Sequence, residues 1–300
     1  MNMHPGELTL TREMIIDLIE TQLPEYRDLL LSEKDYAGTV NHVYRLGEDL
    51  YLRLPRMPQS IELIKEAEWL EYLQAHMTVK LPRPLRICEA TEEYPAVWGV
   101  FEWIHGETCV KIEQKDEARL AVELSDFVKK LQSLPVPENA PFAGRLPLAE
   151  LNQKTQDAIA ACRDMFEEPD MEQRLLKIWT EALEAAPWDG KRYFIHADLL
   201  KTNVMQADGK LQAILDFGGF GAGDPAFDLI PAWAIFGPEA REIYRSRLNH
   251  DEDTWTRAKA YALHQAVLII PYYVETYPEF VETAKYTVRQ IVMDTDANCR

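Results

Sequence analysis

Cysteine is scarce in this sequence, and its spacing excludes several kinds of site. The 300 residues include four cysteines, none of them in a C-x-x-C pair: Cys88, Cys109, Cys162 and Cys299. A disulfide framework or a structural zinc site needs cysteines at closer, paired spacings. We therefore expect neither, and the cysteine usage favours a reducing, cytoplasmic compartment.

Long apolar segments are also lacking. No apolar run approaches the roughly 20 residues that a membrane-spanning helix requires. The first seven residues have neither the basic start nor the apolar stretch of a secretory signal. We expect a protein with no membrane partner, whose length suits one large domain or two modest ones.

Basic residues are few compared with acidic ones, 32 against 50, which gives a formal net charge of −18. Nucleic acids and anionic membranes are bound by basic patches, so neither is expected as a partner. A cleft lined by carboxylates would concentrate a cationic substrate, although acidic residues also serve solubility alone. The excess is spread over the chain, −8 in residues 1–103 and −10 in residues 104–300, and leaves both explanations open.

The first hundred residues combine helical patterns with short strand-like runs. Residues 10–22 have helical spacing with Thr11 as a cap, and Ser60 begins an amphipathic pattern that ends near residue 76. Strand-like runs span residues 26–31, 40–46, 50–54, 85–89 and 96–103. This part of the chain is predicted to form a small antiparallel sheet with helices packed on it.

After Gly106 the pattern becomes mainly helical. Helices are predicted at residues 116–134, 148–164, 171–186, 226–236, 239–248, 254–273 and 278–292, interrupted by two apolar strands at 193–195 and 211–215. The change of pattern near residue 103 predicts an α+β protein of two lobes. A small β-rich lobe, residues 1–103, would face a larger helical lobe, residues 104–300, across a cleft.

Two motifs that follow the predicted strands indicate phosphoryl transfer from a nucleotide. The first reads H-x-D-x-x-x-x-N, from His196 through Asp198 to Asn203, and the second is D-F-G at Asp216. Such chemistry needs a carboxylate that accepts the proton of the attacking hydroxyl, and oxygen ligands that hold Mg²⁺. Each residue alone fits a plain turn or a helix cap. The four together, at this spacing and after apolar strands, favour a phosphotransferase.

The chain resembles the aminoglycoside phosphotransferase family, the small-molecule branch of the protein-kinase-like fold, which includes macrolide phosphotransferases and choline-kinase-like enzymes. The resemblance extends from about residue 34 to residue 273. It is carried by the two motifs, by the segment Gly223 to Leu229 that reads G-D-P-A-F-D-L, and by residues 92–107, which are similar to the family's hinge.

The resemblance implies roles for the residues of the helical lobe. Asp198 matches the catalytic base, and Asn203 and Asp216 match the Mg²⁺ ligands, oxygen donors that suit this cation. His196 would brace the loop rather than react. Lys201 lies where a cation can approach the transferred phosphate, with a solvated lysine as the alternative. Asp224 and Asp228, in the G-D-P-A-F-D-L segment, would cap or pin the catalytic segment.

In the first lobe the resemblance implies a nucleotide site, with ATP or GTP as the donor. Gly38 to Asn41 would be the phosphate-covering loop, and Glu66 the partner of the phosphate-binding cation. Arg53 stands where the family usually has lysine, and its guanidinium can hold a phosphate with two hydrogen bonds. The hinge segment that meets the purine would be Phe101, Glu102, Trp103 and Ile104. An ordinary turn and a solvated glutamate remain alternatives for Gly38 and Glu66.

The catalytic loop departs from the family's pattern at Ala197, where glycine is usual. Alanine there requires a negative φ or some tolerated strain. Candidates for the acceptor pocket are Trp233, Phe236, Tyr272, Tyr273 and Glu275. Core packing is the alternative for the two tyrosines, and a solvated helix end for Glu275.

Four functions fit these residues. The first is a kinase that phosphorylates a hydroxyl of an aminoglycoside or macrolide antibiotic. The second is a metabolic kinase that acts on a sugar or amino alcohol. The third is a nucleotide-binding scaffold without activity, and the fourth is a metal-dependent phosphatase. Because Asp198, Asn203 and Asp216 are all present, we favour a kinase.

Overall fold

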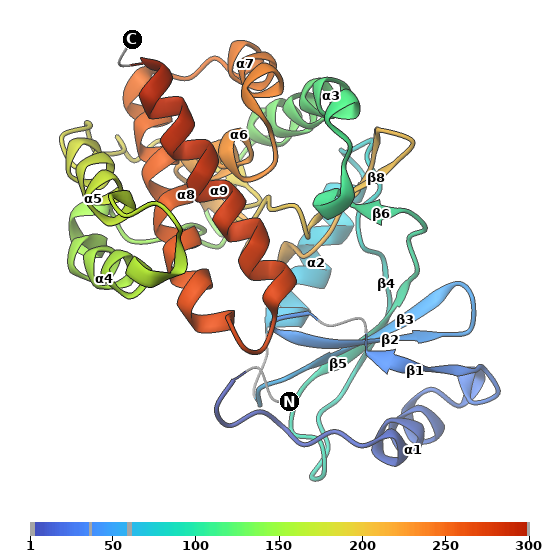
Figure 1. Cartoon of the computed structure of the whole chain (residues 1–300). Coiled ribbons are helices and arrows are strands. Elements are labelled where there is room, and N and C mark those ends of the chain that lie inside the picture. Colours follow the sequence, from blue (N-terminus) through green and yellow to red (C-terminus); the bar gives the residue numbers. More distant parts are fainter. Residues whose placement is uncertain (1–3, 36–37, 59–61, 299–300) are drawn as a thin grey trace. The chain divides into compact units, whose positions relative to one another are not determined.

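A computed structural model describes residues 4–35, 38–58 and 62–298. The chain divides into two compact units, residues 1–105 and residues 106–300. The first unit is built on a five-stranded sheet, and the second is mainly helical (Figure 1), so the prediction of an α+β protein is confirmed. Among the described residues, no helix is both long and apolar enough to cross a membrane.

The sheet of the first unit is antiparallel throughout, in the order β1-β2-β3-β5-β4. The strands are β1 (Leu31–Asp35), β2 (Asn41–Leu46), β3 (Leu50–Pro55), β4 (Pro84–Cys88) and β5 (Trp98–Glu102). The predicted strand at residues 26–31 is wrong. A 3₁₀ turn, η1 (Pro24–Tyr26), begins at Pro24, whose fixed φ suits the first position of a helical turn, and β1 starts only at Leu31.

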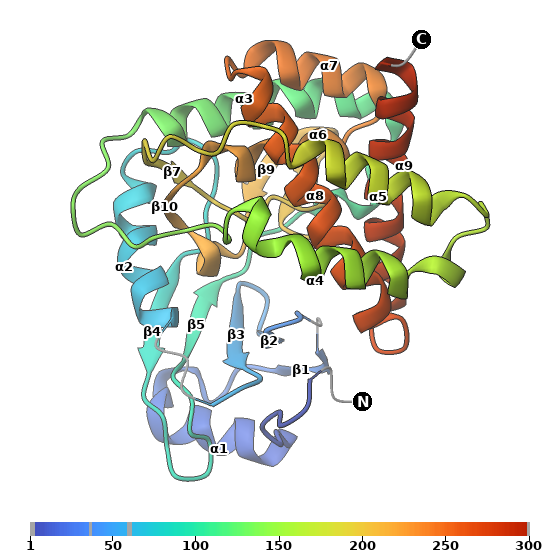
Figure 2. The same ribbon diagram turned by 90° about the vertical axis from the view of Figure 1, so that its left-hand side faces the viewer.

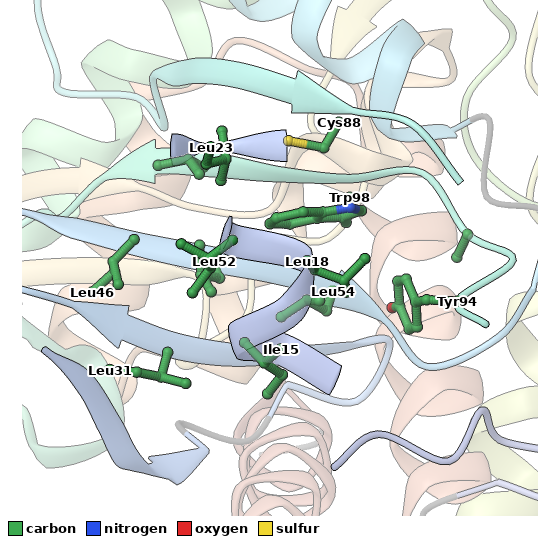
Figure 3. Packing of buried hydrophobic residues seen from close by; sticks show 13 residues of the cluster. Ile15, Leu18, Leu23, Leu31, Leu46, Leu52, Leu54, Cys88, Tyr94 and Trp98 are labelled. Atoms are coloured by element: carbon green, nitrogen blue, oxygen red, sulfur yellow. The ribbon is translucent and has the colours of Figure 1, made fainter. Parts of the chain in front are cut away.

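Alternation along β3 separates the core of this unit from its polar residues. Leu52 and Leu54 point to one face, where they pack with Leu18 of α1 (Arg12–Gln22) and with Trp98 (Figure 3). Arg53, the residue between them, therefore points to the opposite face. The predicted cap of α1 is confirmed, because the Thr11 hydroxyl accepts the Met14 N–H at 3.2 Å. The second helix, α2, spans Glu62–Gln74, and the predicted start at Ser60 lies outside the described residues.

Long helices dominate the second unit. They are α3 (Gln114–Ser133), α4 (Leu148–Ala161), α5 (Met171–Ala182), α7 (Pro238–Arg247), α8 (Glu252–Tyr273) and α9 (Pro278–Asn298). Helix α8 packs along α9, and α4 and α5 cover its other side; α3 lies beside α7 (Figures 1 and 2). The inner position of α8 explains why it is buried over most of its length.

Short strands also lie in this unit. Strands β6 (Glu107–Thr108), β8 (Val204–Ala207) and β9 (Lys210–Ile214) form one small sheet, and β7 (Tyr193–Ile195) pairs with β10 (Gly221–Gly223). The strands predicted at residues 193–195 and 211–215 are confirmed as β7 and β9, whereas the sequence missed β6, β8 and β10. The single helix predicted at residues 226–236 is wrong. The chain instead forms a 3₁₀ segment, η5 (Pro225–Leu229), and a short helix, α6 (Pro231–Ala234), because Pro231 has no N–H to continue the ladder.

Strand β10 requires glycine because other backbone lies against it. A Cβ atom at Gly223 would lie 2.2 Å from the Ala143 carbonyl oxygen. We expect Gly223→Ala to destabilise the protein by about 2–4 kcal/mol, since backbone must move. Gly219→Ala is the matched control, because its Cβ would meet only ordinary contacts at 3.5 Å or more. Denaturant unfolding of the two variants checks this; equal midpoints would contradict it.

Candidate active site

The loop after β7 carries the first motif and is closed on itself by Asn203. The Asn203 side-chain amide donates to the backbone carbonyl of Asp198 at 2.9 Å and to Asp198 Oδ2 at 2.8 Å. The Asn203 carbonyl accepts the N–H of Leu215 at 2.8 Å, which ties the loop to the residue before Asp216. The two motifs are thus joined by backbone as well as by side chains.

A buried carboxylate holds the start of this loop. Asp228 Oδ2 accepts the His196 N–H and Oδ1 accepts the Ala197 N–H, each at 2.9 Å. Ala197 has φ 67°, so the loop uses the left-handed region, where alanine is strained and glycine is not. The two hydrogen bonds that Asp228 accepts offset this strain.

The pKa of Asp228 is raised by burial to about 7, although the hydrogen bonds from His196 and Ala197 oppose the shift. Its neighbour Asp224 caps η5 and pairs with Arg257 at 2.9 Å. Asp228 therefore pins the backbone of the loop, whereas Asp224 caps the segment η5 that carries Asp228.

His196 is a buried, neutral brace. Its Nε2 donates to the Leu215 carbonyl at 2.9 Å, and its Nδ1 accepts the Asp198 N–H at 3.3 Å, which defines one tautomer. Burial lowers the pKa of His196 to about 4; the Leu215 hydrogen bond and the nearby Asp216 oppose this. The ring thus links the two motifs without carrying charge at neutral pH.

The Asp198 carboxylate is held from both sides. Oδ2 accepts from Asn203, and Oδ1 accepts from the Gln265 amide of α8 at 2.8 Å. Burial raises the pKa of Asp198, and the negative charge of Asp216 raises it further; the hydrogen bond from Gln265 lowers it. The carboxylates of Asp198 and Asp216 repel one another, and a cation bound between them would stabilise their ionised forms.

The oxygen donors here fit a magnesium ion. The Asn203 amide nitrogen faces Asp198, so its Oδ1 faces away, and no described residue donates to it. With Asp216, this gives one amide oxygen and one carboxylate. That is a small oxygen set of the kind Mg²⁺ accepts together with waters and phosphate oxygens. In the described part of the chain, no group of three or more His, Cys, Asp or Glu side chains is placed to hold a metal ion.

The first unit brings Arg53, Glu66 and Asn41 into one network. Arg53 Nη1 donates to Glu66 Oε1 of α2 at 2.7 Å. With its amide oxygen turned to the guanidinium, Asn41 accepts from Arg53 Nε at 3.0 Å and from Nη2 at 3.2 Å. Because Glu66 is 5% exposed, a solvated glutamate is the wrong interpretation. The guanidinium is fixed in place before any ligand arrives.

The loop at Gly38 is held by a second arginine. Arg56 Nε donates to the Gly38 carbonyl at 2.9 Å, and Arg56 also pairs with Glu7 at 3.4 Å. His4 Nε2 contacts the Thr39 carbonyl at 2.6 Å. The residues near the N-terminus therefore brace the loop that the sequence assigns to phosphate.

The predicted hinge segment continues β5. Phe101 is fully buried and stacks on Tyr51, while Glu102 pairs with Arg83 at 2.7 Å. Trp103 gives its N–H to the Asp49 carbonyl at 2.7 Å, and Ile104 is half-buried. Purine recognition by these residues stays a prediction.

Lys201 lies in the catalytic loop but is not solvated. It is 9% exposed, and its ammonium stands 3.5 Å from the centre of the Tyr286 ring of α9. Burial lowers the pKa of Lys201, and the nearby Glu117 opposes this. The solvated alternative is therefore wrong, and contact with a phosphate stays a prediction.

The residues predicted to line the acceptor pocket include both buried and exposed side chains. Trp233 and Phe236 are buried, and the Trp233 N–H donates to Asp294 at 3.1 Å. Tyr272 is 52% exposed, so core packing is the wrong interpretation for it, and Glu275 is also exposed.

Sequence reasoning missed two residues near Asp198. Gln265 bonds to Asp198, and the half-buried Arg145 interacts electrostatically with it. Gln265 lies 67 positions from Asp198 on an apolar helix, and Arg145 lies in an irregular segment. No local pattern singles out either residue.

The fold and the catalytic loop define a phosphotransferase of the protein-kinase-like class. The chain belongs to the phosphotransferase enzyme family, whose model matches residues 35–261. The predicted family resemblance and enzyme class are thereby confirmed. No curated protein matches the chain.

Solved structures share the fold at low sequence identity. The GDP and kanamycin complex of APH(2")-IIia is 16% identical, with a TM-score of 0.67 over 93% of this chain and 98% of that one. ADP-bound aminoglycoside phosphotransferase APH(2'')-Ib is 17% identical, with a TM-score of 0.59 over 94% and 99%. Macrolide 2'-phosphotransferase MphH from Brachybacterium faecium is 18% identical, with a TM-score of 0.56 over 92% and 97%. The likeness confirms the protein-kinase-like fold.

The low pKa of His196 gives a pH-dependent stability. The unfolded histidine takes up a proton near pH 6.5 but the folded one only near pH 4, so this part of the stability is lost as the pH falls from 6.5 towards 4. His196→Asn should therefore cost about 1–2 kcal/mol less at pH 5 than at pH 7. Denaturant unfolding at both pH values measures this, with His105→Asn, at an exposed position, as the control. An equal cost at both pH values would contradict it.

Proposed function

We propose that this protein is a nucleotide- and Mg²⁺-dependent kinase that phosphorylates a hydroxyl group of a small molecule, with an aminoglycoside or macrolide antibiotic as the favoured acceptor. The observation that carries the proposal is the fixed Asp198 carboxylate, bonded to Asn203 and close to Asp216. The neighbours that bind aminoglycosides or are macrolide phosphotransferases support the acceptor class. The cysteine usage supports a cytoplasmic location.

In this proposal Asp198 orients the acceptor hydroxyl and takes its proton. Each carboxylate oxygen already accepts one hydrogen bond, which fixes its direction, and each has another lone pair for the substrate. Positioning of this kind, with electrostatic stabilisation, supplies most of the acceleration in phosphoryl transfer. Asn203 Oδ1 and Asp216 would hold Mg²⁺, which neutralises charge on the phosphate oxygens when bound.

The donor would be a nucleoside triphosphate held by the first unit. Arg53 is a permanently charged group that Glu66 and Asn41 hold in one orientation. Neighbouring structures contain GDP or ADP, which is consistent with either ATP or GTP as the donor.

A metabolic kinase is the second candidate, and Arg145 favours it. Burial lowers the pKa of this guanidinium, and its main opposing interaction is with Asp198. A half-buried cation that interacts with Asp198 disfavours a polycationic acceptor and favours a neutral or anionic hydroxyl compound. Parallel assays with antibiotics and with sugars or amino alcohols separate the two.

The role of the base is tested by Asp198→Ala. We expect kcat to fall about 10²–10⁴-fold, because a general base contributes that much, while nucleotide affinity stays within about twofold. A coupled nucleotide-consumption assay and calorimetric nucleotide titration measure the two quantities. Asp157→Ala, an exposed position on α4, is the matched control. Full kcat in Asp198→Ala would exclude this residue as the base.

The role of Arg53 is tested by its effect on the nucleotide. Arg53→Met should raise the nucleotide KM about 10–100-fold, since a charged hydrogen bond is worth roughly 1.5–3 kcal/mol. Because the single change leaves Glu66 buried without its partner, the double variant Arg53→Met/Glu66→Met is measured beside it. Arg27→Met, at an exposed position, is the control. An unchanged KM in folded protein would remove Arg53 from the phosphate site.

A further inference from the structure

Strand β4 lies at an edge of the five-stranded sheet, with β5 as its neighbour (Figure 2). Backbone groups alternate in direction along an antiparallel strand. Glu102 of β5 donates its N–H to the Arg83 carbonyl at 3.0 Å. Two residues earlier, Val100 has the same direction and opposes Arg86 of β4. Ile87, which follows Arg86, therefore directs its N–H and C=O away from the sheet.

Side chains of α1 cover other parts of the sheet edges but not the middle of β4. The Gln22 amide bonds both backbone groups of Glu89, just after β4, at 2.9 and 3.0 Å. At the opposite edge, the Arg12 guanidinium donates to two carbonyls of β1. Among the described residues, no hydrogen bond from outside the sheet reaches the Ile87 backbone. An open stretch of this kind can pair with a strand from another chain.

A groove lies beside this stretch, between α2 and β4. Its volume is about 680 Å³, within the usual range of ligand sites. The apolar part of its lining includes Ile64 and Ala67 of α2 and Leu85 and Ile87 of β4. Ile64 is 41% exposed and Leu85 is 37% exposed, so this apolar surface is open to a partner. A strand added to β4 would place alternate side chains in the groove.

The helical wall of the groove is acidic. Glu68 and Glu71 line it one helical turn apart, both are exposed, and neither forms an ion pair with a described residue. Arg83 is already paired with Glu102 at 2.7 Å. Arg86 alternates with the groove residues of β4 and so points to the opposite face of the sheet. Charge complementarity therefore favours a cation in the groove.

A second copy of this chain does not supply that cation. Two β4 edges paired about a twofold axis would place two acidic α2 walls on the same face of one sheet. Each copy also carries a net charge of −18. Like charges that face one another oppose such pairing, so a partner of opposite charge is favoured.

We propose that the middle of β4 and the adjacent groove are a docking site for an extended segment of a basic partner protein. The segment pairs its backbone with Ile87 and adds a strand to the sheet. In the groove, one apolar side chain packs on Leu85 and Ile64, and a lysine or arginine faces Glu68 and Glu71. Backbone pairing supplies affinity, and the side chains supply specificity. The site uses residues of the first unit alone and does not depend on the proposed kinase activity.

Short peptides test the proposal on the full-length protein. The basic probe is acetyl-Lys-Thr-Val-Thr-Lys-amide, which as a strand carries both lysines and the valine on one face. The neutral probe has glutamine in place of each lysine. Titrations are followed by NMR at the backbone amides of Leu85 and Ile87. We expect the basic probe to bind about threefold to thirtyfold more tightly, since two exposed ion pairs allow that much.

N-methylation of the basic probe separates strand pairing from plain charge attraction. One form is methylated at both threonine nitrogens and another at the valine nitrogen, with the charge unchanged. An added strand directs only alternate N–H groups at its neighbour. One form should therefore bind about tenfold more weakly than the parent, while the other stays within about threefold.

Two double variants test the acidic wall. Glu68→Gln/Glu71→Gln should remove the preference for the basic probe over the neutral one. Asp17→Asn/Glu20→Gln is the matched control, because it removes two exposed carboxylates one turn apart on α1, outside the groove. This control should keep the preference.

Binding at Leu85 and Ile87 with these preferences supports the proposal. It is overturned if the basic probe does not bind up to a few millimolar, if the two methylated forms bind equally, or if Glu68→Gln/Glu71→Gln keeps the preference. Dimers in sedimentation, with the Leu85 and Ile87 signals changing on dilution of the protein, would place a second copy on this edge and also overturn it.

Discussion

The catalytic segment depends on one carboxylate that accepts two adjacent backbone N–H groups. Asp228 binds the N–H of His196 and of Ala197 and so holds Ala197 at a positive φ. The turn that results directs the Asp198 side chain towards Asn203 and Gln265. Without it, alanine would relax to a negative φ, and the Asp198 side chain would leave its partners.

The two motifs are then joined through groups that carry no charge. Neutral His196 spans from the Asp198 N–H to the Leu215 carbonyl, and Leu215 returns its N–H to Asn203. Charge is concentrated in Asp198 and Asp216, and the pKa of Asp198 is raised first by burial and then by repulsion from Asp216. A site built in this way favours a bound cation, which is what transfer from a nucleotide requires.

The sequence predicted the α+β class, the family and most long helices, because these follow from periodicity and from two closely spaced motifs. Short elements escaped it: β6, β8 and β10 have two to four residues, too few to show a period. The helix predicted across Pro231 failed because proline removes a backbone donor. The strand predicted at residues 26–31 failed because a 3₁₀ turn occupies residues 24–26 and β1 starts only at Leu31.

The residues of the candidate site also divide into those that a local sequence pattern identifies and those that only the fold brings together. Asp198, Asn203 and Asp216 stand in recognisable local patterns, and Arg53 could be aligned by its strand. Gln265 and Arg145 could not be found, because only the tertiary fold brings them to Asp198. Burial, which the sequence does not report, also decided against a solvated Lys201 and a solvated Glu66.

We propose that the chain moves a phosphoryl group from a nucleotide to a hydroxyl. Mass spectrometry of acceptors after incubation with ATP or GTP and Mg²⁺, over a panel of aminoglycosides, macrolides, sugars and amino alcohols, tests this directly. We expect a phosphate ester of at least one acceptor, formed only with both nucleotide and Mg²⁺. Nucleotide binding with no ester from any acceptor would contradict it and indicate a scaffold.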